Sequence, residues 1–350
     1  WNHRTFPQIL KSVGYVTAHA GKWQLSGTHP DLVHEAGFDE TCMWAYRHNL
    51  PEGIEHTVGW EGKKGRKTSR YWHPCILRNG SYVRTQPDEY GPDIFTRFVI
   101  DFATRHRQRP FLIYYPMVLT HAPYYSTPAT TRSPADHFRH RADNWRHNVE
   151  YMDALVGRVV SALEDLGIRE RTVLFFTGDN GTRSRGKGQP TERGARVPMI
   201  VNGPGIVAPR PPCEELTDLT DILPTLLEFA GTDLPADRPI DGVSLVPFLH
   251  GTGPVPREWI YSYVGGYRIL RDKRWLLEAD RPDRPGRFYD CGDCRDGTDY
   301  RDVTASDAPE VLAARTRFEK ILSDKPVPDI HAATDGKETG TRHGGRRITD

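Results

Sequence analysis

The sequence has few cysteines, no long apolar segment and almost no net charge. No apolar run approaches the roughly 20 residues that a membrane-spanning helix needs, which excludes a transmembrane segment within these residues. The 47 Lys and Arg residues nearly cancel the 46 Asp and Glu residues and leave a formal charge of +1. This balance gives no indication of a nucleic-acid or membrane-surface partner, so any anion-binding function must come from a local cluster of side chains.

Cysteine is scarce and unevenly spaced. The five cysteines are an odd, scattered set rather than a disulfide framework: Cys42, Cys75, Cys213, Cys291 and Cys294. The last two have C-x-x-C spacing, but a zinc site would need a second such pair, and the sequence has none. Two interpretations stay open for this pair, a local disulfide or two plain thiols in a turn.

Apolar strands alternate with amphipathic helices through the first 255 residues. Helical spacing predicts helices over about 6–13, 93–102, 148–166 and 219–231. Short apolar runs predict strands over 15–19, 111–115, 172–177 and 197–201. This alternation is typical of an α/β fold with a mostly parallel sheet flanked by helices.

The pattern changes after about residue 255. Three short strand-like runs, over 259–263, 268–270 and 274–277, are separated by turn residues and predict a small antiparallel sheet. From about residue 329 the chain is polar and rich in glycine, which favours disorder. We therefore expect a large domain over 1–255, a small α+β subdomain over 256–328 and a tail over 329–350.

Chemically useful side chains follow several of the predicted strands. Lys22 follows the first, His121 the second, Asp179 and Asn180 the third, and Lys187 comes shortly afterwards. Since the carboxyl ends of parallel strands meet at one edge of a sheet, we expect these side chains to share one rim. Taken singly, each has an ordinary interpretation as a turn residue, a solvated lysine or a loop histidine.

Together these side chains predict an ester hydrolase. Asp and Asn offer the hard oxygen ligands that suit calcium or magnesium. Two lysines supply positive charge for a tetrahedral oxyanion, and a histidine can protonate a leaving alcohol. The expected substrate is an ester of sulfate or phosphate.

The sequence resembles the type I sulfatase family, the formylglycine-dependent enzymes of the alkaline phosphatase superfamily. The clearest stretch is Gly14 to Leu25, which ends in Gly-Lys-Trp-Gln-Leu where the family signature has Gly-Lys-Trp-His-Leu. Seven further stretches resemble the family in its own order: 37–39, 110–123, 177–181, 187–198, 221–225, 242–248 and 288–290. The resemblance covers about residues 5–305 and implies an alkaline-phosphatase-like fold in which residues 1–255 form the catalytic domain.

The resemblance also implies roles for individual residues. Asp179 and Asn180 would ligate Ca²⁺, or alternatively Mg²⁺, while Lys22 and Lys187 would bind the sulfate oxygens. His121 would help to protonate the leaving oxygen. The implied nucleophile is a hydrated formylglycine, made from Cys or Ser by a formylglycine-generating or other maturation enzyme. It would attack sulfur, release the alcohol, and then expel sulfate by collapse of a hemiacetal.

Two departures from the family pattern bear on catalysis. None of the five cysteines begins the Cys/Ser-x-Pro-x-Arg nucleophile motif, and the paired Asp residues of the first family strand are missing. We therefore expect an N-terminally truncated fragment that does not itself hydrolyse sulfate esters.

Gln24 stands where the family has His, and Gln cannot act as a base near neutral pH. Either His19 or a water substitutes, or the second half-reaction is slow.

The leading hypothesis is hydrolysis of a sulfated sugar or an aryl sulfate. Two alternatives are a phosphonate or phosphate ester hydrolase of the same superfamily and a non-catalytic sulfoglycan-binding relative, which Gln24 favours. Recognition of the sugar is expected within 46–90, which is rich in aromatic and basic residues: Trp60, Lys63, Lys64, Arg66, Tyr71, Trp72 and His73. The competing interpretation of that segment is a structural hairpin. Family membership further implies a periplasmic or extracellular location.

Overall fold

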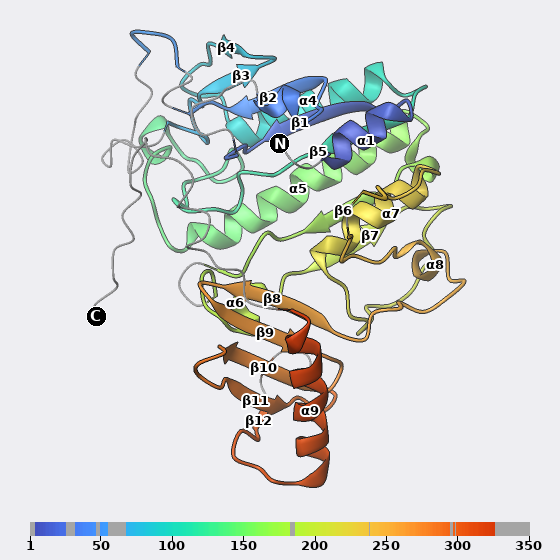
Figure 1. Ribbon diagram of the computed structural model, residues 1–350. Helices are drawn as coiled ribbons and strands as arrows, with labels where there is room; N and C mark the ends of the chain where they lie inside the picture. The colour runs from blue at the N-terminus through green and yellow to red at the C-terminus, as the bar shows by residue number, and fades with distance from the viewer. Residues whose placement is uncertain are drawn as a thin grey trace, which may run out of the picture. The chain divides into compact units, whose positions relative to one another are not determined.

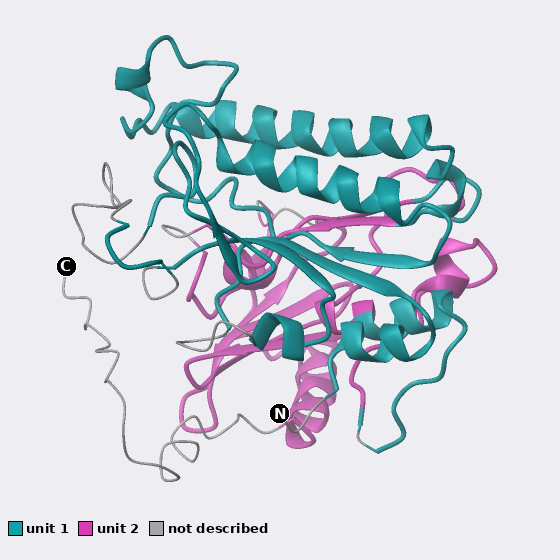
Figure 2. Ribbon diagram, turned by 90° about the horizontal axis from the view of Figure 1, so that it is seen from above, with its two compact units in different colours: residues 1–173, 203–206, 223–239 teal, residues 174–202, 207–222, 240–350 magenta. Residues whose placement is uncertain are grey.

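A computed structural model describes residues 4–25, 32–46, 50–54, 68–182, 186–237, 239–294, 297 and 299–325. Contacts between residues divide the chain into two compact units (Figure 2). Unit 1 comprises 1–173, 203–206 and 223–239, and unit 2 comprises 174–202, 207–222 and 240–350. The segment 174–202 is therefore grouped with the C-terminal part of the chain. Among the described residues, no helix is both long and apolar enough to cross a membrane.

Unit 1 contains a five-stranded sheet in the order β4-β3-β2-β1-β5. Its strands are β1 (Val16–Gly21), β2 (Glu40–Trp44), β3 (Ile76–Arg78), β4 (Ser81–Val83) and β5 (Phe111–Tyr114). Strand β1 runs parallel to both β2 and β5, whereas β2, β3 and β4 pair antiparallel. The sheet is therefore mixed. Its parallel strands include β1 and β5, which are followed by the segments that contain Lys22 and His121.

Helices cover both faces of this sheet. They are α1 (Phe6–Ser12), α2 (Leu32–Glu35), α4 (Gly91–Arg105), α5 (Asn144–Asp165) and most of α7 (Ile222–Phe229), with short 3₁₀ turns at Pro134–Asp136 and Arg169–Arg171. Figure 2 shows α4 and α5 along one face and α1 along the other. Alternate residues of β5 meet the two layers, since Ile113 packs beside Leu163 of α5 and Leu112 packs beside Leu10 of α1.

Helix α4 begins earlier than its sequence predicts. Asp93 was expected to start the helix at about residue 93, but Tyr90 is the N-cap residue and Asp93 lies in the first turn. Its two carboxylate oxygens instead both lie 2.9 Å from the Tyr151 hydroxyl, which donates one shared hydrogen bond to them, and Oδ1 accepts a 2.6 Å hydrogen bond from Arg158; both partners are on α5. A contact between two helices therefore took the place of the local cap.

Unit 2 contains two sheets. Strands β6 (Leu174–Thr177) and β7 (Met199–Asn202) form an antiparallel pair, so these two predicted strands exist but do not run parallel to each other. The second sheet is antiparallel in the order β12-β11-β10-β9-β8: β8 (Ile260–Val264), β9 (Tyr267–Arg271), β10 (Trp275–Asp280), β11 (Arg287–Asp290) and β12 (Arg301–Asp302). The short elements are α6 (Glu192–Ala195), a 3₁₀ turn at Leu219–Asp221, and α8 (Val246–Leu249).

Helix α9 (Pro309–Ser323) covers one face of the second sheet (Figure 1). Its buried face contributes Phe318 and Leu322, which pack with Trp275 and Phe288 of the sheet. The expected α/β class with a smaller C-terminal antiparallel sheet is confirmed.

The aromatic segment before α4 serves the core in its described part. Tyr71 is fully buried, and Trp72 is 3% exposed and stacks on His137 with ring centroids 3.6 Å apart. The hairpin interpretation therefore holds for β3 and β4, and these two aromatic residues are not open to a sugar. Trp60, Lys63, Lys64, Arg66 and the tail over 329–350 lie outside the described residues.

Candidate functional site

Lys22 lies directly after β1, where this strand meets the segment that follows β5. Its backbone N–H donates a 2.9 Å hydrogen bond to the Pro116 carbonyl. Gly21 has φ of 96°, and a Cβ atom at this position would lie 2.4 Å from the same carbonyl oxygen. Glycine is therefore needed before Lys22, both for its backbone conformation and for the close approach of the two segments.

His19 is buried on β1 and is not available as an exposed base. It is fully buried, and its ring packs edge-on against Trp23 at 5.2 Å between centroids. Burial lowers the pKa of His19 to about 4, so the ring is neutral near pH 7. Its Nε2 lies 3.2 Å from the Lys22 carbonyl, and its Nδ1 has no hydrogen-bond partner among the described residues. The structure thus argues against His19 as the substitute for the family's missing histidine.

Gln24 is exposed just beyond the end of β1. Interaction with its side chain lowers the pKa of the Tyr46 hydroxyl, but burial has the larger effect. Burial raises the pKa of Tyr46 well above its usual range, so this hydroxyl stays protonated near neutral pH. Neither Gln24 nor Tyr46 is therefore a general base at neutral pH.

His121 lies in the loop after β5, beside a buried arginine that the sequence analysis missed. The Arg70 side chain is 2% exposed and lies over the ring of Trp44 at 4.8 Å. Its Nη2 lies 3.1 Å from His121 Nδ1 and donates to the Ala122 carbonyl. His121 Nδ1 also lies 2.6 Å from the Ala122 carbonyl oxygen, so Arg70 and this carbonyl together hold the Nδ1 edge of the ring.

Tyr71 holds the backbone of the same loop. Its hydroxyl donates to the carbonyl of Val118 at 2.8 Å and also to the carbonyl of His121. The sequence analysis expects either recognition of the sugar or a structural hairpin in the segment that contains Arg70 and Tyr71. In the folded protein it supports the loop of His121, 50 residues further along the chain.

Asp179 and Asn180 follow β6 in a turn packed against the loop that carries Lys187. A Cβ atom at Gly181 would lie 1.8 Å from the Arg193 carbonyl oxygen, and one at Gly186 would lie 2.1 Å from the same atom. The Gly181 N–H donates 3.0 Å to the Gly194 carbonyl. Only residues without side chains allow these backbones to approach so closely.

Lys187 is exposed in this loop, which spans residues 186–195 and is called the lysine loop below. Its backbone N–H donates 2.9 Å to the carbonyl of Thr182, in the segment that follows Asn180. The structure therefore brings three predicted site residues of unit 2 into one local assembly. Lys22 and His121 form the corresponding set in unit 1, at the ends of the neighbouring strands β1 and β5.

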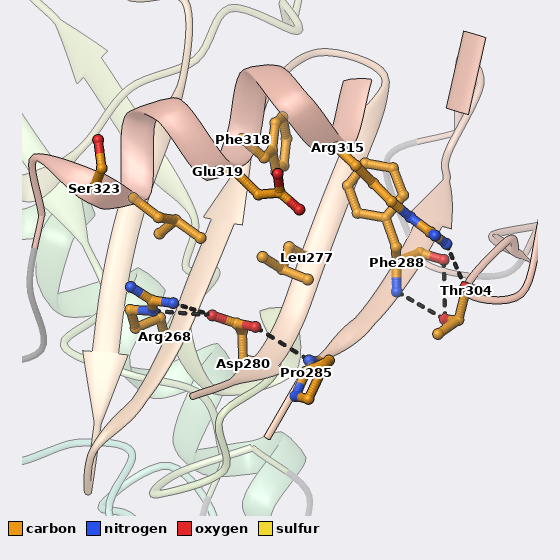
Figure 3. Close-up of a pocket in the computed structure, with 12 residues that line it drawn as sticks. Arg268, Leu277, Asp280, Pro285, Phe288, Thr304, Arg315, Phe318, Glu319 and Ser323 are labelled. Atoms are coloured by element: carbon orange, nitrogen blue, oxygen red, sulfur yellow. Dashed lines mark hydrogen bonds and ion pairs between the residues drawn. The ribbon is translucent and has the colours of Figure 1, made fainter. Parts of the chain in front are cut away.

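The two principal cavities lie away from both sets. One, of about 420 Å³, opens between α9 and its sheet, where Arg268 and Asp280 form an ion pair (Figure 3). The other, of about 360 Å³, lies in unit 1 next to Trp72 and His137. Neither is lined by a predicted catalytic or metal-binding residue, so neither of these two cavities marks the candidate site.

The residues present fit part of a calcium site. The Asp179 side chain is exposed, and the Asp179–Asn180 pair supplies two hard oxygen ligands on a turn that close backbone packing holds in place. Calcium takes six to eight oxygen ligands. In the described part of the chain, no group of three or more His, Cys, Asp or Glu residues is arranged to hold a metal ion. The described residues therefore provide two ligands of such a site and not its complete set.

Residues 2–232 match the sequence profile of the family described as Sulfatase. The chain belongs to the sulfatase family. This membership agrees with the order in which the chain presents its lysines, its histidine and its Asp-Asn turn.

Named sulfatases align along most of the chain. Arylsulfatase D of Homo sapiens is 28% identical over 353 residues, covering 78% of this chain and 58% of its own length. N-acetylgalactosamine-6-sulfatase of Canis lupus familiaris is 32% identical over 287 residues, covering 74% of this chain and 51% of its own length. The steryl-sulfatase of Mus musculus is 34% identical, but only 34% of its length is covered. The chain thus spans about a third to three fifths of these relatives.

Solved sulfatase structures share the fold. The PsFucS1 sulfatase from Pseudoalteromonas sp. superposes with a TM-score of 0.68 at 21% identity, covering 93% of this chain and 74% of its own. A structure described as a complex with its substrate, D-glucosamine-2-N,6-O-disulfate, gives a TM-score of 0.60 at 18% identity and covers 93% of this chain and 82% of its own. At these identities the likeness establishes the fold alone.

Proposed function

We propose that this chain provides the substrate-binding and leaving-group side of a sulfatase active site that hydrolyses sulfate esters. The observation that carries the proposal is the joint assembly of Asp179, Asn180 and Lys187 in unit 2. An Asp-Asn pair and a lysine held on one compact turn and loop suit a divalent cation and a sulfuryl oxygen together. The proposal requires a nucleophile from outside these 350 residues, because none of the five cysteines begins the family motif.

Each residue of the chain has a distinct task in this proposal. Lys22 and Lys187 bind the non-bridging sulfate oxygens as point charges, with Lys187 next to the leaving oxygen. His121, with its ring protonated, donates a proton from Nε2 to the leaving oxygen, which departs as the alcohol while the ring becomes neutral. Arg70 and the Ala122 carbonyl support this role by holding the Nδ1 edge of the ring, at 3.1 and 2.6 Å.

Two groups complete the site in the proposal. Asp179 and Asn180 would hold Ca²⁺, which neutralises the sulfate oxygens when bound. A formylglycine, produced by a maturation enzyme, would supply the attacking oxygen. The substrate class is a sulfated sugar or an aryl sulfate, in keeping with the names of the related arylsulfatases and N-acetylgalactosamine-6-sulfatases. A periplasmic or extracellular location is proposed on the same family grounds.

The experiment measures hydrolysis of p-nitrophenyl sulfate and p-nitrophenyl phosphate by a full-length, matured form of the protein. We expect turnover of the sulfate ester and a loss on the order of 10²- to 10³-fold in kcat for Lys187→Ala, since a positioned charge next to the leaving oxygen contributes that much. Lys273→Ala is the matched control, because Lys273 is a half-exposed lysine of unit 2 that pairs with Glu215.

The outcomes separate the three hypotheses. Faster hydrolysis of the phosphate ester than of the sulfate ester indicates a phosphate or phosphonate ester hydrolase. Binding of a sulfated oligosaccharide without turnover of either ester indicates a non-catalytic relative. Equal activity of Lys187→Ala and the parent protein contradicts the role proposed for the lysine loop.

A further inference from the structure

The lysine loop is attached to the C-terminal sheet of unit 2 by a buried network of charged and polar groups. Glu192, in the short helix α6 at the end of the loop, pairs with Arg271 of β9 at 2.9 Å between Oε1 and Nη1. The Tyr300 hydroxyl accepts a 2.8 Å hydrogen bond from Arg271 Nη1 and donates one of 2.7 Å to Glu192 Oε2. The three side chains therefore close a triangle of one ion pair and two hydrogen bonds.

This triangle is shielded from solvent. The Arg271 side chain is 5% exposed and that of Glu192 is 15% exposed, so water weakens their interaction much less than it weakens a surface ion pair. Arg271 Nη1 also donates to the Cys291 sulfur at 3.3 Å. Burial raises the pKa of the Cys291 thiol to about 11, so Arg271 faces a neutral thiol there and its charge partner is Glu192.

A bulge in β10 supplies two more contacts to the same loop. The pairing of β10 with β9 shifts register between Leu277 and Asp280, and Ala279 adopts φ of 53°. The Ala279 N–H donates 2.9 Å to the carbonyl of Pro190, and the Glu278 carboxylate accepts 2.5 Å from the Glu192 N–H. A bulge changes the direction in which the groups of one strand point. Here the Ala279 N–H and the Glu278 carboxylate both bind the lysine loop.

We propose that Arg271 is a positioning residue for Lys187, acting through Glu192, and that the C-terminal sheet is therefore part of the catalytic apparatus. The inference rests on the proposed function, in which Lys187 binds a sulfate oxygen next to the leaving group. Glu192 is five residues from Lys187 in the lysine loop. The close contacts of the glycines hold this loop against the Asp179–Asn180 turn, and the contacts of Pro190 and Glu192 hold it against the C-terminal sheet. Loss of the attachment at Glu192 moves Lys187 relative to the Asp179–Asn180 turn.

The first test compares Arg271→Gln with the parent protein in the full-length matured form, using aryl sulfates of increasing leaving-group pKa. Displacement of Lys187 removes stabilisation of the leaving oxygen, so the loss grows with leaving-group pKa. We expect a small change with p-nitrophenyl sulfate and a decrease in kcat on the order of 10- to 100-fold with the poorest leaving group. Arg271→Lys keeps the positive charge and is expected to restore part of this loss.

The control is Arg257→Gln. Arg257 forms a similarly buried ion pair with Asp221 in unit 2, and no described contact joins it to the lysine loop. If Arg257→Gln changes the dependence on leaving-group pKa as much as Arg271→Gln does, the effect is general destabilisation and the inference is overturned. Tyr300→Phe leaves the ion pair in place and covers the case in which Arg271→Gln does not fold. It is expected to change the same dependence in the same direction, and an unchanged dependence contradicts the inference.

A second measurement does not depend on turnover. Amide hydrogen exchange of residues 186–195 is expected to accelerate in Arg271→Gln and to stay at the parent rate in Arg257→Gln. If exchange becomes faster but the matured protein hydrolyses no sulfate ester, the attachment of the loop is supported and only the proposed function is refuted. Unchanged exchange of this loop refutes the attachment itself, whatever the activity.

Discussion

At the scale of single residues, burial decides what each ionisable side chain is able to do. His19 and His121 both lie in segments that resemble the family. His19 is nevertheless buried in the core, whereas His121 is exposed beside Arg70. A sequence shows two histidines near functional segments and does not distinguish them. Only the packing of Trp23 against His19 shows that this ring is a structural residue.

His19 makes the stability of the fold depend on pH. Its folded pKa of about 4 lies below the ordinary value of 6.5, so between these values the unfolded chain binds more protons. The free energy of unfolding is therefore expected to fall by about 3 kcal/mol as the pH decreases through this window. His19→Phe keeps the aromatic packing and should flatten this slope in urea titrations at several pH values. The exposed His250→Gln should retain the slope, and a slope that persists in His19→Phe contradicts the assignment.

At the scale of elements, glycines join the Asp179–Asn180 turn to the lysine loop. Asn180-Gly181 alone indicates a turn, and nothing local in the sequence requires a second backbone to lie against it. The structure supplies the reason, because Gly181, Gly186 and Gly194 each lie closer to another backbone than any side chain permits. The turn and the loop are therefore one element for the purposes of the site.

Adding a methyl group to this element should destabilise it. Gly181→Ala places a Cβ 1.8 Å from the Arg193 carbonyl oxygen, which forces the two backbones apart. We expect a loss of about 1–3 kcal/mol in the free energy of unfolding, together with weaker Ca²⁺ binding by the full-length form. Gly157→Ala is the control, since Gly157 lies in α5 with no atom within 4 Å of the added Cβ. It should stabilise the protein by about 0.5–1 kcal/mol, measured by the same denaturant titration.

At the scale of the whole molecule, the predicted site residues are divided between the two contact units. Lys22 and His121 belong to unit 1, and Asp179, Asn180 and Lys187 belong to unit 2. Unit 2 also contains the C-terminal sheet, which the sequence analysis assigns to a separate small subdomain over 256–328. The contacts of Glu192 with Arg271 and Glu278 connect that sheet to the lysine loop.

A divalent cation should govern activity in the full-length form. Asp179 and Asn180 offer only two of the ligands that Ca²⁺ needs, so EGTA should be able to remove the ion. Its removal is expected to abolish hydrolysis of p-nitrophenyl sulfate, and added CaCl₂ should restore it. Asp179→Ala should raise the CaCl₂ concentration needed for half-maximal activity by at least about tenfold. Asp283→Ala alters an exposed aspartate of unit 2 and is the control. Full activity of the EGTA-treated protein would exclude the metal role.

The sequence by itself indicated the main helices and strands between residues 6 and 231, three strands of the C-terminal sheet and the order of the family-like segments. It also indicated Lys22, His121, Asp179, Asn180 and Lys187 as candidate site residues. Periodicity and short motifs are local properties, so residues within about a dozen positions are enough to reveal them. The tertiary structure alone decided that β6 and β7 pair antiparallel, that Trp72 serves the core, and that Arg70 supports His121. It also decided that Glu192 is attached to Tyr300, 108 residues further along the chain. Contacts over such separations arise from packing of whole elements, and no local pattern of residues encodes them.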